Sequence, residues 1–234
     1  MSVGLYRAAV AMVGHEQRLD AIAANIANLG TSGYKRNTSA THEFSVQRDR
    51  RQIRGQEVQG HTDFSQGNLE RTGRPYDLAM FGDGFFAVEG PEGELYTRTG
   101  SFRLTQQGVL VTEEGFEVAW ERRGGTIDGN GVEIVVDGAG NVKQGVQDLG
   151  QLKLRDFLDR NQLQQVRGGY WAAPSRAKEA TVTGSIHQYS LEQSNAAGFE
   201  EIVAMIGIQR AFESVSNLTR SIQQSYSRLT RQSA

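Results

Sequence analysis

The sequence predicts an α+β protein in which a long helix at each end of the chain flanks a glycine-rich antiparallel β domain. Near both termini, apolar residues recur at alternating spacings of three and four, which is the period of a helix. In the middle of the chain, apolar and polar residues alternate in short runs, which is the period of a strand. Of the 28 glycines, 21 lie between Gly55 and Gly169, where turns favour residues that tolerate positive φ.

The N-terminal helix is expected over residues 5–28. Two series of positions run along it at seven-residue intervals: Leu5, Met12, Leu19 and Ile26, with Ala8, His15, Ile22 and Leu29 three residues behind. Two largely apolar positions in every seven form the seam of a coiled coil. Asn28 and Gly30 then supply residues that tolerate the left-handed backbone at a helix end.

The C-terminal helix is expected over residues 197–229. Its two series are Met205, Phe212, Thr219 and Tyr226, with Ile208, Val215, Ile222 and Leu229 three residues behind. Ser194 and Asn195 stand where an N-cap belongs, and Glu200 and Glu201 complement the dipole of the first turns. Because amphipathic helices gain most of their stability from packing, both seams are expected to need partners.

These patterns divide the chain into four segments. Residues 1–36 form an N-terminal assembly helix, 37–71 an extended linker with one or two short strands, 72–193 a β-rich domain, and 194–234 a C-terminal assembly helix. Within the β-rich segment, strands are expected at residues 85–88, 95–97, 102–104, 109–111, 116–120, 132–136 and 151–154. Short runs separated by glycine-containing turns are typical of an antiparallel β domain.

Composition excludes several classes of partner and site. The net charge of −2 gives no support for nucleic-acid binding, and Asp49 interrupts the one short basic run, at residues 48–54. The chain has no cysteine, so neither disulfides nor thiolate metal sites are expected. Neither a cleavable signal peptide nor a membrane-spanning segment is expected, so direct membrane insertion is not predicted either.

No catalytic, cofactor or metal site is predicted. The four histidines form no short-spaced pair, and Gly82-Asp83-Gly84 and residues 137–141 lack the spacing of a calcium loop and suit turns instead. The aromatic residues Trp120, Tyr170 and Trp171 leave one alternative open, a carbohydrate-binding β domain with accessory helices. A generic coiled-coil homodimer is a further alternative.

Three separate motifs resemble the axial proteins of the bacterial flagellum, the rod and hook family of the basal body. The N-terminal motif is carried by Leu19, Asp20, Ile22, Asn25, Ile26, Ala27, Asn28, Thr31, Gly33, Tyr34 and Lys35. Family members more often have Asn, Val, Asn and Pro at positions 24, 29, 30 and 32. The central motif covers residues 77–79, 82–86 and 96–102, and the C-terminal motif is carried by Ser194, Asn195, Glu200, Glu201, Val203, Met205, Ile206 and residues 209–213.

The resemblance implies a structural, non-enzymatic subunit that leaves the cytoplasm through the flagellar type III export apparatus without a cleaved signal peptide. It implies self-assembly with other rod subunits in the periplasmic part of the basal body, through the two terminal helices. Length and a brief linker make the chain most similar to the proximal-rod subunit, with the distal-rod subunit as the alternative. The expected assembly interface comprises Leu5, Met12, Leu19, Ile22, Asn25, Ile26, Asn28, Met205, Ile208, Gln209, Phe212, Val215, Ile222 and Leu229.

Overall fold

The chain folds into two compact units. The computed structural model describes the backbone of residues 3–48 and 51–232, and the side chains of residues 10–39 and 60–224. Met1–Ala27, Asn37–Asp63 and Ala196–Ala234 form the first unit, and Asn28–Arg36 and Phe64–Asn195 form the second. The described secondary structure is α+β, as the sequence predicts.

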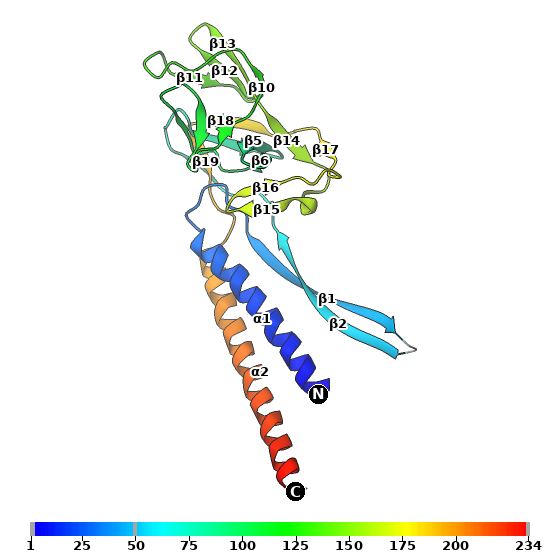
Figure 1. Cartoon of the computed structure of the whole chain (residues 1–234). Coiled ribbons are helices and arrows are strands. Elements are labelled where there is room, and N and C mark those ends of the chain that lie inside the picture. The colour runs from blue at the N-terminus through cyan, green and yellow to red at the C-terminus, as the bar shows by residue number, and fades with distance from the viewer. Residues whose placement is uncertain (1–2, 49–50, 233–234) are drawn as a thin grey trace. The chain divides into compact units, whose positions relative to one another are not determined.

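Two helices form most of the first unit. Helix α1 spans Val3–Ala27 and helix α2 spans Gly198–Gln232, close to the predicted limits. The helices pack against each other and run in opposite directions (Figure 1). Both predicted helices are therefore confirmed.

The first unit also contains a hairpin where the sequence predicts a linker with short strands. Strands β1 (Asn37–Arg48) and β2 (Arg51–Thr62) pair antiparallel along their whole length, from Asn37 opposite Thr62 to Arg48 opposite Arg51. Both strands also contact α1. The ladder of backbone hydrogen bonds, which apolar alternation does not reveal, gives this polar segment its regular structure.

The second unit contains the remaining strands. Its main sheet has the order β15-β16-β6-β5-β9-β8-β7, and β14 pairs with β5 and with β17. A four-stranded sheet has the order β10-β13-β12-β11, and the pairs β18-β4 and β19-β3 complete the unit. The strands are β3 (Leu69–Arg71), β4 (Leu78–Phe81), β5 (Phe85–Gly90), β6 (Gly93–Thr97), β7 (Phe102–Leu104), β8 (Leu110–Thr112), β9 (Glu117–Val118), β10 (Trp120–Arg123), β11 (Ile134–Val136), β12 (Asn141–Gln144), β13 (Gln147–Leu152), β14 (Leu154–Phe157), β15 (Gln164–Arg167), β16 (Tyr170–Ala172), β17 (Glu179–Ala180), β18 (Ser185–Gln188) and β19 (Ser190–Glu192).

Strand β5 supplies both of the larger hydrophobic clusters. Successive strand residues point to opposite faces, so Phe86 joins the cluster around Leu152 while Phe85 joins the one around Trp171. Phe86 meets the Phe102 ring edge-on at a centroid distance of 5.4 Å, and Phe85 lies 6.0 Å from Trp171. The two neighbouring phenylalanines therefore fix β5 between two apolar layers.

One glycine permits a close approach of two backbone segments in this core. The Leu78 amide donates to the Gly100 carbonyl at 2.9 Å, and a Cβ added at Gly100 would lie 1.5 Å from the Leu78 carbonyl oxygen. No side chain can occupy that position without moving the backbone.

Candidate assembly surface and polar joint

The paired helices enclose a groove that contains several predicted assembly residues. Its volume is about 590 Å³. The lining residues are Met12, Val13, His15, Glu16 and Leu19 from α1, and Ile208, Gln209, Phe212 and Glu213 from α2. The structure thus brings together five residues of the predicted interface: Met12, Leu19, Ile208, Gln209 and Phe212.

The other predicted interface residues fall into three groups. Ile22 and Asn25 are buried, with 8% and 1% of their surface exposed. Five residues are half-buried: Ile26, Asn28, Met205, Val215 and Ile222. The side chains of Leu5 and Leu229 lie outside the described residues.

Asn25 bonds within its own chain. Its side-chain amide donates to the Asn37 carbonyl at 2.8 Å, and its side-chain oxygen accepts from the Asn37 amide at 2.8 Å. Thr62 donates its hydroxyl to the Asn37 side chain at 3.2 Å. These bonds join the end of α1 to the start of β1 and the end of β2, all inside the first unit.

Residues 199–206 of α2 carry an exposed apolar stripe, of which the sequence analysis names only Val203 and Ile206, and those as motif residues. Phe199, Ile202, Val203 and Ile206 are 81%, 50%, 54% and 47% exposed. Their spacing places them on one face of the helix. Periodicity could have revealed this stripe, but the seven-residue series directs attention to the other face of the helix.

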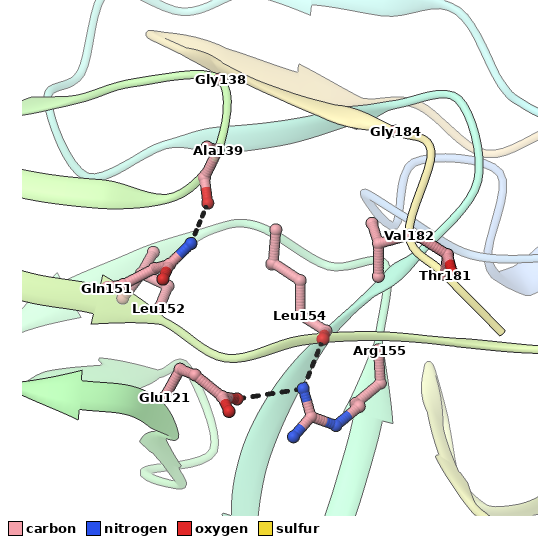
Figure 2. Close-up of a pocket in the computed structure, with 10 residues that line it drawn as sticks. All are labelled: Glu121, Gly138, Ala139, Gln151, Leu152, Leu154, Arg155, Thr181, Val182 and Gly184. Atoms are coloured by element: carbon pink, nitrogen blue, oxygen red, sulfur yellow. Dashed lines mark hydrogen bonds and ion pairs between the residues drawn. The ribbon is translucent and has the colours of Figure 1, made fainter. Parts of the chain in front are cut away.

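A second groove, of about 500 Å³, lies in the second unit between β10, β13, β14 and residues 181–184 (Figure 2). Arg155 is its principal cation. The Arg155 guanidinium pairs with Glu121 at 3.0 Å and Glu179 at 3.4 Å, and it donates to the Leu154 carbonyl at 2.9 Å. The charged groups drawn there bond to one another, which is the pattern of a structural ion-pair network.

The aromatic residues considered for carbohydrate binding lie in the core. Tyr170 and Trp171 are 2% and 1% exposed, and Trp120 packs against the cluster around Leu152. Tyr170 and Trp171 therefore present no face on which a sugar could stack, whereas Trp120 is half-buried. Among side chains 10–39 and 60–224, no group of three or more His, Cys, Asp or Glu residues is placed to hold a metal ion.

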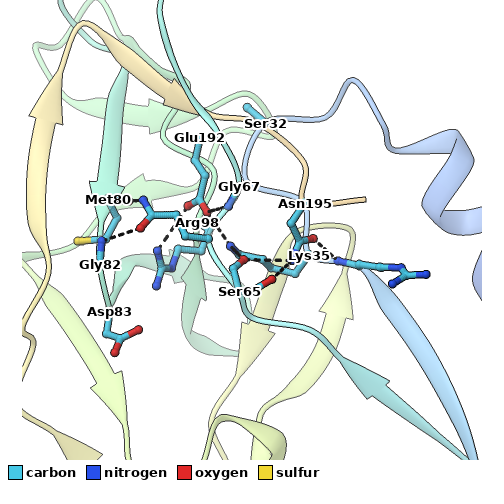
Figure 3. A network of polar contacts seen from close by, with 12 residues as sticks. Ser32, Lys35, Ser65, Gly67, Met80, Gly82, Asp83, Arg98, Glu192 and Asn195 are labelled. Carbon is cyan, nitrogen blue, oxygen red and sulfur yellow. Dashed lines mark hydrogen bonds and ion pairs between the residues drawn. The ribbon is translucent and has the colours of Figure 1, made fainter. Parts of the chain in front are cut away.

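A buried ion network links distant segments of the second unit (Figure 3). The Lys35 ammonium donates to the Glu192 carboxylate at 2.6 Å and to the Ser65 carbonyl at 2.7 Å. The other Glu192 oxygen accepts from Arg98 at 3.4 Å, and the Gly67 amide donates to the first at 2.9 Å. The Lys35 and Glu192 side chains are both 0% exposed.

Asn195 adds a second set of bonds beside this network. Its side-chain oxygen accepts from the Arg36 amide at 2.7 Å, and its side-chain nitrogen donates to the Ser65 carbonyl at 3.0 Å. We call these six residues together the polar joint: Lys35, Ser65, Gly67, Arg98, Glu192 and Asn195.

Gly33 allows the polar joint to close. Its amide donates to the Glu192 carbonyl at 2.6 Å, its φ is 69°, and an added Cβ would lie 2.4 Å from the Arg98 carbonyl carbon. The backbone of the N-terminal segment therefore lies directly against that of Arg98.

Arg98 is buried and its guanidinium is only partly satisfied by hydrogen bonds. Burial lowers the pKa of its guanidinium below the usual value, and the Glu192 carboxylate opposes that change. The guanidinium lies 5.1 Å from the Phe85 ring centroid, and its Nε has no hydrogen-bond partner among the described residues. Two cations therefore depend on one buried carboxylate.

Sequence analysis did not predict this network. Charged residues are normally solvated, and ion pairs across more than a hundred residues leave no local pattern. One signal was available, because Lys35 and Arg98 both lie inside motifs that carry the family resemblance.

Comparison with known proteins matches all three parts of the chain to flagellar families. Residues 5–35 match the flagella basal body rod protein family, residues 79–144 the flagellar hook protein FlgE/F/G D1 domain, and residues 187–232 the flagellar basal body rod FlgEFG protein C-terminal family. Among the described residues, neither helix combines the length and apolarity needed to cross a lipid bilayer.

Curated relatives match over most of the chain. The flagellar basal-body rod protein FlgF of Mesorhizobium japonicum is 33% identical over 94% of this chain and 93% of its own length. FlgF of Caulobacter vibrioides is 33% identical over 86% of each chain, and FlgG of the same organism is 29% identical over 94% of this chain and 95% of its own. The chain belongs to the family of flagellar basal-body rod proteins.

Proposed function

We propose that this chain is a structural subunit of the flagellar basal-body rod and polymerises through α1 and α2 into the axial drive-shaft. The exposed stripe of Phe199, Ile202, Val203 and Ile206 carries this proposal. Contiguous apolar side chains in water cost about 25 cal/mol per Å², which a neighbouring subunit removes by covering them.

The helix pair supplies the geometry for such contacts. We propose that the seams of α1 and α2 act as a coiled-coil-like pair. The groove lined by Met12, Leu19, Ile208 and Phe212 supports this, because its lining includes seam residues of both helices. A stripe that docks onto a different surface of the next subunit makes a heterologous contact, and such contacts generate helical filaments.

The partners of the chain are other copies and other rod subunits, together with the flagellar export apparatus that delivers it without a cleaved signal peptide. Its location is the periplasmic rod of the basal body, and it does not insert directly into a membrane. It has no catalytic role. Three observations support a non-catalytic role. The family models that match the chain describe rod and hook proteins, Arg155 in the second groove is paired with carboxylates, and the charged groups of the polar joint are paired with one another.

Within the rod we propose the proximal position, with the distal position as the alternative. The basis is the length of the given sequence, 234 residues, and the brief linker after α1, which forms a single hairpin of two 12-residue strands. Electron cryotomography of basal bodies that carry an epitope-tagged chain tests this, and label at the distal end of the rod would overturn it.

The assembly proposal is tested by Ile206→Asp, which places a charge in the stripe. Leu158→Asp is the matched control, because Leu158 is 72% exposed and lies in the second unit. Ile206→Asp should leave the helical circular dichroism of the purified chain unchanged and remove the chain from isolated basal bodies, with loss of swimming. Leu158→Asp should assemble and swim normally. Equal incorporation of both variants would refute the role of the stripe.

Sedimentation separates the rod proposal from a generic coiled-coil homodimer. A rod subunit exposes its stripe until it meets the growing filament, so dilute purified chain should sediment as a monomer. A stable dimer at micromolar concentration would favour the homodimer.

A further inference from the structure

We propose that Lys35, Arg98 and Glu192 are positioning residues, which gather every connection of the β-rich second unit to the rest of the chain into one stiff anchoring point. The inference rests on the proposed function only for its mechanical consequence. All contacts of the joint lie inside the second unit.

The path of the chain makes the polar joint unusual. The chain passes between the two units four times, after Ala27, Arg36, Asp63 and Asn195. The second unit comprises residues 28–36 and 64–195, and the passages reach it in three short stretches, called the three segments below: residues 28–36, the start of residues 64–195 and the end of residues 64–195. Three separate segments would ordinarily give three independent tethers.

The polar joint ties all three segments together. Lys35 of the first segment bonds to Ser65 of the second and to Glu192 of the third. Gly67 of the second segment donates to Glu192 of the third, and Asn195 of the third bonds to both Arg36 and Ser65. Every pair of the three segments is therefore joined by at least one direct hydrogen bond.

Arg98 connects the three segments to the rest of the β domain. It follows β6 directly, and its guanidinium reaches Glu192 while resting on the Phe85 ring of β5. Asp83 and Arg160 also act on Arg98 electrostatically, and Arg160 in turn pairs with Asp83 at 2.9 Å and Asp156 at 2.9 Å. Positive and negative groups thus alternate from Lys35 into β14.

Burial of the three charged side chains, Lys35, Arg98 and Glu192, makes the centre of the joint stiff. Side chains at 0% exposure exchange no hydrogen bonds with water, and removing one partner leaves an uncompensated charge in a medium of low polarity. A surface ion pair at the same place would open readily. In the first unit, neutral hydrogen bonds among Asn25, Asn37 and Thr62 join the end of α1 to the start of β1 and the end of β2.

The consequence is that force transmitted along either terminal helix enters the β domain at one ordered point. In a rod that transmits rotation, a loose joint would let the places at which force enters the second unit move against one another. A variant that removes Lys35 but keeps the Glu192–Arg98 pair should therefore loosen the joint while the β core stays folded.

The test compares Lys35→Met with Val142→Ala in the full chain. Lys35→Met removes the ammonium, keeps most of the length of the side chain and leaves Glu192 paired with Arg98. Val142 is fully buried in the core, away from the joint. Hydrogen exchange is measured at two sets of amides. Gly33, Arg36 and Gly67 report on the joint, and Ala87 and Lys153 report on the core.

Lys35→Met should accelerate exchange at the three joint amides by at least about tenfold relative to Val142→Ala, and leave the two core amides no faster than in that control. Unchanged exchange at the joint amides, or equal acceleration of both sets, would refute the proposal that Lys35 stiffens the polar joint.

A second arm measures swimming in media of increasing viscosity, in a strain that lacks its own copy of the gene. Cells with Lys35→Met should stop at a lower viscosity than cells with Val142→Ala, at equal amounts of chain in isolated basal bodies. Equal viscosity limits would overturn the mechanical consequence. Absence of the unaltered chain from basal bodies would instead overturn the proposed function, while the exchange measurement would still decide the joint.

Discussion

Replacing the shared carboxylate of the polar joint, Glu192→Gln, should destabilise the second unit strongly. The substitution keeps the shape of the side chain and removes the only described acidic group bonded to both Lys35 and Arg98. At 2.6 Å and 3.4 Å, an effective dielectric constant near 20 gives gross attractions of about 6 and about 5 kcal/mol. Dehydrating the carboxylate offsets several kcal/mol of this, so a net cost of about 3–5 kcal/mol is expected.

The two units can be followed separately during unfolding. Both tryptophans, Trp120 and Trp171, lie in the second unit, whereas both helices lie in the first. Tryptophan fluorescence therefore reports on the second unit and circular dichroism at helical wavelengths on the first. With a urea dependence of about 2 kcal/mol per molar, Glu192→Gln should lower the fluorescence midpoint by about 2 M.

Asp148→Asn is the matched control for this substitution. It makes the same carboxylate-to-amide change in the exposed ion pair between Asp148 and Arg122, whose side chains are 50% and 67% exposed. Its fluorescence midpoint should stay unchanged, because exposed pairs contribute little. A Glu192→Gln midpoint no lower than that of Asp148→Asn would refute the reasoning.

Three further predictions concern the second unit. A chain that begins at residue 37 lacks the segment that carries Lys35, so its fluorescence midpoint should be lower than that of a chain that begins at residue 28; equal midpoints would show that the segment contributes nothing. Gly100→Ala should lower the free energy of unfolding by about 3 kcal/mol, because its new methyl meets the Leu78 carbonyl, while Gly30→Ala, with nothing within 4 Å, should be neutral in the same urea titration. Burial, with a hydrogen bond to Glu114, raises the pKa of Tyr170 above its ordinary 10.0, so this group stabilises the fold fully below pH 10 and that contribution is lost as pH rises through the folded-state pKa. The free energy of unfolding of Tyr170→Phe should therefore fall less steeply between pH 9 and pH 11 than that of the unaltered chain, and parallel curves would contradict this.

The helices and the turn-rich β domain could be predicted because their signals are local. A seam repeats every seven residues whatever the helix packs against, and the turn at Asp137 needs only its own neighbours, since the Asp137 carboxylate accepts from the Ala139 and Asn141 amides at 3.0 and 2.9 Å. Hydrogen bonds from Asn141 hold the pKa of Asp137 below its usual value, as expected for such a turn.

The long hairpin and the polar joint could not be predicted for a common physical reason. The pairing of β1 with β2 is decided by register, and polar residues such as Thr38 and Gln59 carry no apolar alternation that would show it. The partners Lys35 and Glu192 are separated by 157 positions, so nothing near either residue indicates the other. Both features depend on contacts that exist only after the chain has folded.

Because 157 positions separate Lys35 from Glu192, the joint can form only when the chain contains the whole β domain. A chain made from its N-terminus presents Lys35 early, but the carboxylate that neutralises it belongs to Glu192, the last residue of the last strand, β19. Until Glu192 has been added, burying the Lys35 ammonium is strongly unfavourable, so residues 28–36 stay uncommitted instead of docking onto an unfinished partner. A chain cut short anywhere before residue 192 would therefore leave residues 28–36 undocked.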